Sequence, residues 1–131
     1  MIAFLTLHIP STAADTTDEW YIAMPGRGKW RIIEAKFAPA TAVAANDTNY
    51  VEVTITTNDG AAGSDSSAIG SFTTQVTGGA ALALKTTRDI TLSGGSALEL
   101  TEGQQIKIAK TDPGSGGILD GTFTFCLEKI N

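Results

Sequence analysis

Apolar and polar residues alternate with a period of two along most of this 131-residue chain. Val51, Val53 and Ile55, for example, alternate with polar residues. Because successive side chains of a strand point to opposite faces, such alternation predicts a strand with one buried face. The same pattern predicts strands at 3–9, 19–24 and 30–37, around Ile90 and Leu92, around Ile106 and Ile108, around Phe123, Phe125 and Leu127, and in a shorter segment at 82–85.

Two segments carry finer predictions. In segment 30–37, Trp30 and Ile32 are expected to share one face, and Ile33, Ala35 and Phe37 the opposite face. Segment 66–76 leaves two interpretations open, because its apolar residues are spaced as in a helix whereas a glycine and threonines disfavour one. A short helix and a strand both fit this segment.

Glycine, proline and Asx residues separate the predicted strands at intervals of roughly eight to twelve residues, which is typical of a sandwich or barrel. Pro25-Gly26-Arg27-Gly28 predicts a tight turn, because proline fixes φ and glycine accepts a positive φ. The strands on either side, with Trp20 and Trp30, are expected to form a hairpin. Asp120-Gly121 is expected to open the last strand, and the Gly/Ser/Ala stretch 59–68 to form a mobile loop.

Strands with one apolar face must bury that face against a second layer. The chain is therefore predicted to be all-β, an antiparallel two-sheet β-sandwich of about eight strands. Jelly-roll topology is preferred, ahead of an immunoglobulin-like or other Greek-key sandwich. The length predicts a single domain over residues 1–131, with the N-terminal segment 1–18 as a candidate interface strand or arm.

Composition narrows the classes of partner. The net charge of −5 disfavours nucleic acid, because neutralising phosphates requires a clustered basic surface. No apolar run approaches ~18 residues, so no membrane span is expected. The segment Ile2–Ile9 lacks the basic start and cleavage site of a signal peptide, which favours a protein made and kept, or assembled, in a cytoplasm.

Residues that carry chemistry are few. His8 and Cys126 are the only histidine and the only cysteine, and a dyad between them is disfavoured because they lie among strand residues far apart in the sequence. The oxygen donors at 58–65 lack the ligand pattern of a calcium loop. We expect no catalytic residue, no metal and no cofactor. The acidic residues sit mostly in turns and at strand ends without a paired spacing: Asp15, Asp18, Glu19, Glu99, Glu102, Asp112 and Asp120.

Two groups of residues are candidates for contacts with other molecules. Arg27, Lys29 and Arg31 form either a basic cluster that binds an acidic protein surface or a plain solvated turn. Trp20 and Tyr21 are neighbours on a predicted strand, so they point to opposite faces and at least one is expected to be exposed. An exposed aromatic residue suits a subunit interface or a sugar platform.

The order of segments adds a family resemblance. A Pro-Gly turn precedes a strand (Pro25 to Phe37), a Thr-rich strand follows (Thr48 to Thr57), and then comes a Gly/Ser loop. Later come the stretch Leu98 to Ile108 and a closing Phe/Thr strand. Over Trp20 to Ile130 this layout resembles the small capsid decoration, or cement, proteins of tailed bacteriophages.

The resemblance implies a non-enzymatic virion protein, made in the host cytoplasm. Such a protein is a jelly roll that trimerises on the outer capsid surface and bridges subunits of the major capsid protein. Its partners would be that capsid protein and itself, with no nucleic acid and no membrane. The alternative is a receptor- or carbohydrate-binding module of a phage fibre or tail, and an enzyme comes third. Candidate interface residues are Ile2, Phe4, Leu5, Trp20, Tyr21, Arg27 and Lys29.

Overall fold

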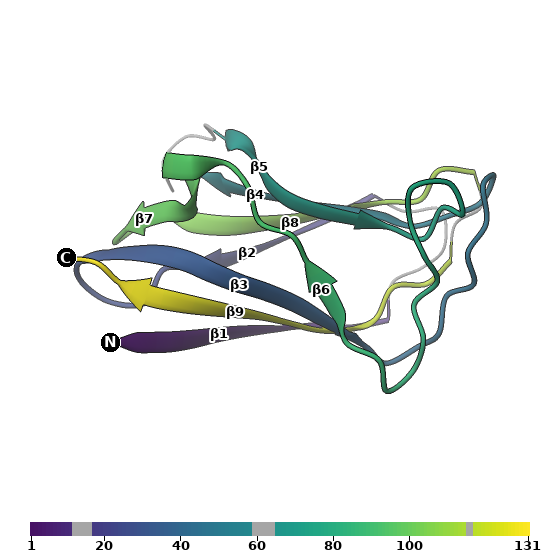
Figure 1. Cartoon of the computed structure of the whole chain (residues 1–131), viewed down its shortest axis with the longest axis horizontal. Coiled ribbons are helices and arrows are strands. Elements are labelled where there is room, and N and C mark those ends of the chain that lie inside the picture. Colours follow the sequence, from purple (N-terminus) through teal and green to yellow (C-terminus); the bar gives the residue numbers. More distant parts are fainter. Residues whose placement is uncertain (12–16, 59–64, 115–116) are drawn as a thin grey trace.

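The computed structural model consists of two antiparallel sheets packed against each other (Figure 1). It describes residues 1–11, 17–58, 65–114 and 117–131. A short 3-10 helix, η1 (Gly95–Leu98), precedes β7. One sheet contains β1 (Ile2–Ile9), β9 (Gly121–Lys129), β3 (Lys29–Pro39), β6 (Arg88–Ile90) and β7 (Glu99–Thr101). The other contains β2 (Asp18–Ala23), β8 (Gln105–Thr111), β4 (Glu52–Asn58) and β5 (Asp65–Thr73).

The strand order is that of a jelly roll. The sheets run β1-β9-β3-β6 and β2-β8-β4-β5, and β7 pairs with β3 on the same edge as β6. β6 and β7 thus occupy one interrupted strand position, and counting them once leaves eight positions. Their chain order is then 1-8-3-6 in one sheet and 2-7-4-5 in the other, which is two Greek keys. The predicted sandwich and its preferred topology are both confirmed.

The core lies between the sheets and absorbs most of the aromatic residues. Phe37, Phe72, Phe123 and Phe125 are all buried, and the ring centroids of Phe37 and Phe123 are 4.5 Å apart. Phe37, Phe123 and Phe125 belong to one sheet, and Phe72 of β5 faces them from the other sheet together with buried apolar residues of β4 and β8. Each such side chain contributes roughly 1.5–3 kcal/mol when it is removed from water.

A β-bulge in β3 overturns the face assignment predicted for this strand. Ile32 pairs with Leu127 but Glu34 pairs with the next residue of β9, Cys126, so Ile33 is an extra residue. The bulge resets the alternation, and Ala35 and Phe37 therefore point into the core together with Trp30 and Ile32. Ile33 is left on the outer face. The prediction that Ile33, Ala35 and Phe37 share a face was wrong.

The ambiguous segment 66–76 is a strand over most of its length. β5 pairs with β4, and a bulge at Ile69 lets both Ile69 and Gly70 be buried. That bulge disturbs the period of two, which explains why the sequence pattern also fitted a helix. Residues 65–68 of the expected loop 59–68 belong to β5, and residues 59–64 lie outside the described part of the chain.

The turn at Pro25–Gly28 does not close a hairpin. Gly26 and Gly28 do have positive φ, as predicted. However, β2 pairs with β8 in one sheet and β3 lies beside β9 in the other, so the chain crosses between the sheets at this turn. Both strands present apolar residues to the same core from opposite sides. The alternation of apolar and polar residues along each strand is the same whether the two strands form a hairpin or lie in different sheets.

Three other expected strands are shorter than predicted. At 82–85, Leu82 forms an isolated bridge with Val43, and Lys85 adopts a left-handed backbone conformation that ends any extension. β6 ends at Ile90, and Leu92 lies in the connection to η1. The Thr-rich strand expected at Thr48 to Thr57 begins only at Glu52, as β4. The remaining predicted strands are found within one or two residues of their expected bounds, and Gly121 opens β9 as expected.

Candidate interaction surface

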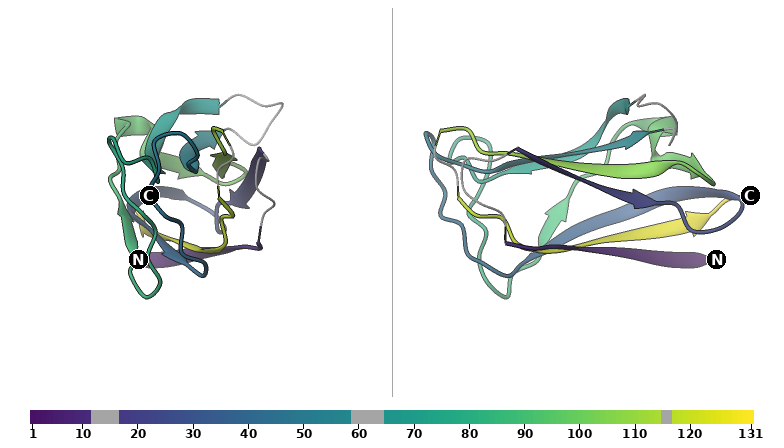
Figure 2. Two further views of the ribbon diagram at one scale, coloured as in Figure 1. Left: turned by 90° about the vertical axis from the view of Figure 1, so that its right-hand side faces the viewer. Right: turned by 180° about the vertical axis from the view of Figure 1, so that it is seen from behind.

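The sandwich has two flanks, each formed by one edge of both sheets. β5 and the β6/β7 position lie along one flank, which we call the closed flank. β1 and β2 lie along the other, which we call the open flank. The end-on view shows the two flanks on opposite sides of the molecule (Figure 2).

The connection between β6 and β7 covers the closed flank. The Ser93 amide donates a hydrogen bond to the Ile69 carbonyl at 2.8 Å, and the Thr57 hydroxyl donates to the Ala97 carbonyl at 2.9 Å. Gly70 lies directly under Ile90, where an added Cβ would come within 2.8 Å of the isoleucine Cγ2. A loop that covers a sheet edge in this way protects its backbone groups from pairing with another chain.

The open flank is closed less completely. Apart from Ile9, which is 0% exposed, the side chains of β1 and β2 that point into the sandwich remain only partly buried, whereas those of the central strand β8 are fully buried. Among the residues that the structure describes, β1 pairs only with β9 and β2 only with β8. Apolar surface and unpaired strand edges therefore coincide on this flank. Its inward-pointing apolar residues are Ala3, Leu5, Leu7, Trp20 and Ile22.

β1 is an edge strand that carries no acidic residue, lysine, arginine, proline or bulge of its own. All eight of its residues pair with β9 in an unbroken antiparallel register. It contains no Asp, Glu, Lys or Arg, and its only proline neighbour, Pro10, follows its end. On its outer face Ile2 is 50% exposed and Phe4 67% exposed. Natural sheets usually protect such an edge with charge, proline, a bulge or a cover, and β1 has none of the first three.

β2 presents a different edge. Tyr21 points outward and is 48% exposed, and its hydroxyl donates to Glu19 Oε2 at 2.9 Å. Lys107 Nζ lies 3.6 Å from the other oxygen of the same carboxylate. Trp20 points the other way and packs against the core. The opposite orientation of these two aromatic residues is as predicted.

The sequence did not single out Lys110, a buried lysine of β8 that pairs with Asp18 at the start of β2. Lys110 continues the inward row of Ile106 and Ile108, and its side chain is 0% exposed. Its Nζ lies 2.6 Å from Asp112 Oδ2 and 3.9 Å from Asp18 Oδ2. The signal was present in the sequence, because the alternation of β8 places this lysine on the core side.

Glu99 forms ion pairs with two of the three residues of the predicted basic cluster. Lys29 Nζ lies 2.7 Å from Glu99 Oε2, and Arg31 hydrogen-bonds the other oxygen of that carboxylate. Hydrogen bonds from Lys29 and Arg31 hold the pKa of Glu99 below its usual range. Arg27 is exposed at the turn before β3. Of the three cations, Lys29 and Arg31 thus hold β7 against β3.

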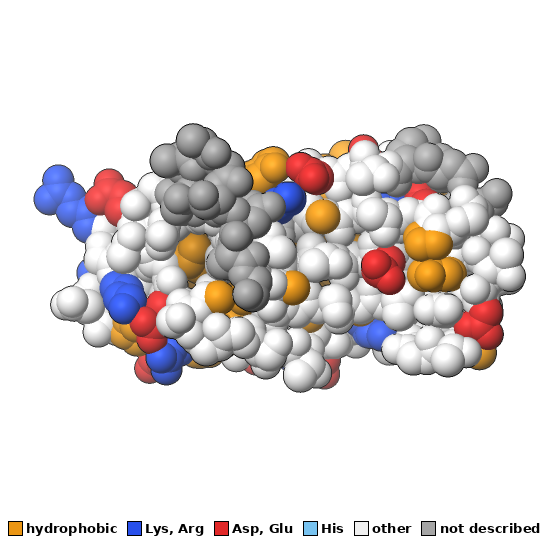
Figure 3. Space-filling model, turned by 90° about the horizontal axis from the view of Figure 1, so that it is seen from above, with side chains coloured by type: hydrophobic (Ala, Val, Ile, Leu, Met, Phe, Trp, Pro, Cys, Tyr) orange, Lys and Arg blue, Asp and Glu red, His pale blue; other side chains and the backbone are white. Residues whose placement is uncertain are grey.

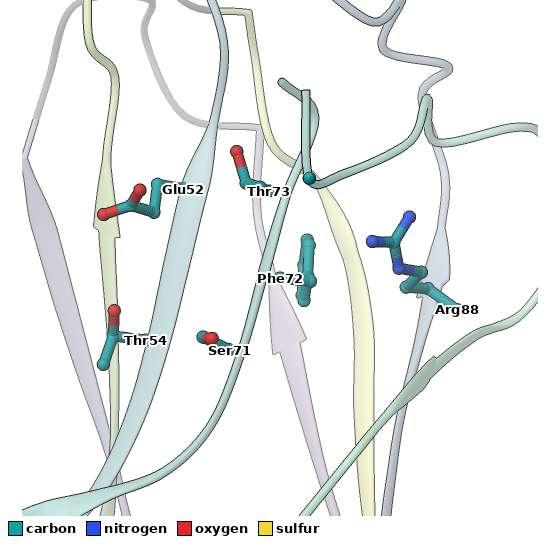
Figure 4. Close-up of a pocket in the computed structure, with 7 residues that line it drawn as sticks. Glu52, Thr54, Ser71, Phe72, Thr73 and Arg88 are labelled. Carbon is teal, nitrogen blue, oxygen red and sulfur yellow. The ribbon is translucent and has the colours of Figure 1, made fainter. Parts of the chain in front are cut away.

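A polar hollow of about 330 Å³ lies beside β5, near the closed flank (Figure 4). Glu52, Thr54, Ser71 and Thr73 supply its carboxylate and hydroxyl groups from β4 and β5. Arg88 of β6 stands at its far side, with its guanidinium carbon 5.7 Å from the Phe72 ring centroid. From above this sheet, hydrophobic side chains form only separate small patches (Figure 3). The hollow is therefore suited to a polar ligand.

The other sequence candidates do not converge. His8 pairs with Thr122 and Cys126 with Phe4, so the two side chains are four residues apart along β9, about 13 Å. That distance excludes the dyad in this arrangement. Within residues 1–11, 17–58, 65–114 and 117–131, no group of three His, Cys, Asp or Glu residues could hold a metal ion. The candidate calcium stretch 58–65 lies largely outside the described residues.

The described chain also contains no helix that is long and apolar enough to cross a membrane. No family model and no curated protein matches the chain. A chain in the "Structure of infectious bursal disease virus Gx strain" aligns with a TM-score of 0.42 at 10% sequence identity. The alignment covers 96% of the present chain and 32% of the viral chain, so our chain spans about a third of its length.

Proposed function

We propose that this protein is a non-enzymatic structural protein of a bacteriophage virion. It decorates the outer surface of the capsid and stabilises it, as a trimer that bridges major capsid subunits. The resemblance in segment order suggests this role, and the surface supports a protein that acts by adhesion. The single observation that carries the proposal is the open flank, where an uncharged edge strand exposes Ile2 and Phe4.

An apolar patch on an otherwise acidic, polar protein marks a contact with another macromolecule. Burying it stabilises an assembly in proportion to the apolar area removed from water. A protein that binds the assembled shell but not free capsid subunits stabilises the shell by mass action. Joining three copies raises the effective concentration of each capsid contact, so weak individual contacts suffice.

Capsid attachment is tested by sedimenting the protein with expanded capsids of its phage. We expect co-sedimentation of the unmodified protein. Arg27→Glu is expected to weaken attachment without changing the melting temperature, because the exposed guanidinium is free to meet an acidic capsid surface. Lys85→Glu, the same charge change in a loop near the other end of the sandwich, serves as the control. No co-sedimentation of the unmodified protein would refute the capsid role.

A second candidate function, receptor or carbohydrate binding by a fibre or tail module, rests on the polar hollow. Hydroxyl, carboxylate and guanidinium groups around one depression match the hydrogen-bonding needs of a sugar. Binding of a soluble glycan panel would test it, with Arg88→Met expected to abolish any signal. Ser96→Ala, outside the hollow on η1, is the matched control.

A further inference from the structure

We infer that the trimer forms by strand addition, with the free edge of β1 in one copy pairing with the free edge of β2 in the next copy. This inference rests on the proposed trimer and names the surfaces that build it. The partner is a second copy of this chain. Each copy contributes both edges of its open flank: its β1 edge pairs with one neighbouring copy and its β2 edge pairs with the other.

The number and position of the edges point to this pairing. A ring of three copies requires a heterologous contact, in which two different surfaces of the chain meet. The open flank presents two different edges, the eight residues of β1 and the six of β2. Pairing β1 with β2 of a neighbour uses both edges in every copy. Pairing β1 with β1 forms a two-fold dimer and leaves both β2 edges unpaired.

The faces of the two strands also match. Residues that are adjacent across a strand pair share a face of the sheet. When the outer faces are aligned, exposed Phe4 of one copy joins the face that carries exposed Tyr21 of the next. The inward side then brings Leu5 and Leu7 together with Trp20 and Ile22, all of which are only partly buried in the single copy. One contact therefore buries both sets of apolar side chains.

The charges favour β1 as the partner of β2. β2 begins with Asp18 and Glu19, and the Asp18 side chain is 37% exposed while that of Glu19 is 46% exposed. A second β2 edge would bring further carboxylates to this acidic strand. β1 carries no acidic residue, so its approach adds no repulsion. Charge therefore disfavours pairing between two β2 edges and permits pairing between a β1 edge and a β2 edge.

Thiol cross-linking tests the pairing in the full chain. The background is Cys126→Ser, because Cys126 lies opposite Phe4 within one copy and would otherwise react with a cysteine there. Phe4→Cys and Tyr21→Cys are combined in that background and treated with a short bismaleimide. We expect a covalent trimer from the double variant and single chains from each variant alone.

The two variants with a single introduced cysteine show which strand edges pair between copies. Dimers from Phe4→Cys alone would show β1 paired with β1 and would overturn the inference. Single chains from the double variant would overturn it as well. Co-sedimentation with capsids is measured on the same samples. Cross-linked trimers that fail to co-sediment contradict the capsid role alone, whereas capsid binding without cross-linked trimers contradicts the strand pairing alone.

Charge variants give an independent measurement that leaves the core intact. Thr6 is exposed on the outer face of β1, and Thr124 lies beside it in the same row on β9. Thr6→Glu is expected to lose the trimer because it adds an acidic group against the acidic edge of β2. Thr6→Lys and the control Thr124→Glu are expected to retain it. If Thr6→Lys loses the trimer as Thr6→Glu does, the acidic edge of β2 does not face this position of β1 and the inference is wrong.

Discussion

The two flanks of this sandwich differ in how far the sheet edges are covered by other parts of the same chain. On the closed flank, the connection between β6 and β7 covers the β5 edge and makes specific hydrogen bonds to Ile69 and Ala97. On the open flank, the described residues supply no such cover, and Leu5, Leu7 and Trp20 stay partly exposed. Within the described residues, the closed flank is complete in one copy, whereas the open flank leaves apolar side chains that a second molecule can bury.

This difference separates residues that fold the chain from residues that assemble it. Side chains under the closed flank and between the sheets are expected to affect the stability of a single copy. Side chains on the outer face of β1 are expected to affect association instead. The following variants, from the largest expected effect to the smallest, test whether that separation holds.

Two phenylalanines on neighbouring strands give the largest contrast. Phe125 of β9 is 0% exposed and Phe4 of β1 is 67% exposed. Phe125→Ala is expected to lower the free energy of unfolding by about 3–5 kcal/mol, because it leaves a cavity in the core. Phe4→Ala is expected to change it by less than about 0.5 kcal/mol. Denaturant unfolding in the non-assembling Thr6→Glu background measures both free-energy changes. A similar loss of stability for the two variants would contradict the separation between folding and assembly residues.

The buried ion pair anchors the β2 side of the open flank. Asp112→Ala is expected to cost about 3–5 kcal/mol, because it removes the nearest partner of a fully buried ammonium group. Replacing both partners, as in Lys110→Met with Asp112→Leu, is expected to restore most of the lost stability. Chemical denaturation compares the two variants. If the double variant is as unstable as Asp112→Ala, desolvation of Lys110 is not the cause.

The tight contact on the closed flank predicts a smaller effect. Gly70→Ala is expected to cost about 1–3 kcal/mol, because its Cβ would collide with Ile90. Ala23→Ser, on the exposed face of β2, is the control and is expected to be nearly neutral. Thermal unfolding measures both changes. A neutral Gly70→Ala would mean that the cover over β5 shifts easily and that the two flanks differ less than described.

The smallest effect is a pH dependence at the β7 end of the closed flank. The pKa of Glu99 is lowered in the folded protein by its hydrogen bonds to Lys29 and Arg31. Its contribution to stability is therefore present above the ordinary glutamate pKa of about 4.3 and is lost as pH falls through the lowered folded value. The difference in denaturation midpoint between the native chain and Glu99→Gln is expected to shrink on acidification. A constant difference would contradict this role.

Local alternation predicted the fold well because nearly every strand has one face in the core. It failed where a strand departs from the period of two, as at Ile33 of β3 and Ile69 of β5, since a bulge leaves no distinct local signal. It also assigned a hairpin to the turn at Pro25–Gly28, where the chain instead crosses between the two sheets. A turn between two strands of one sheet and a turn between two sheets require the same residues, and only the long-range pairing with β8 and β9 decides between them.

The candidate surface was predicted in part. Ile2, Phe4 and Tyr21 were expected at an interface, and all three are exposed in a single copy. That β1 and β2 are both edge strands follows from the whole topology and could not be read from either segment alone. The pairing of Lys29 with Glu99 likewise depends on β7 lying beside β3, because these residues are far apart in the sequence.

The central claim is that the open flank is where copies of this chain join, and the most direct test is the molar mass of the unmodified protein in solution. Light scattering at micromolar concentration is expected to give three times the mass of one chain. A single-chain mass under the same conditions would contradict the account, because the apolar edge of β1 would then be stable in water without a second copy.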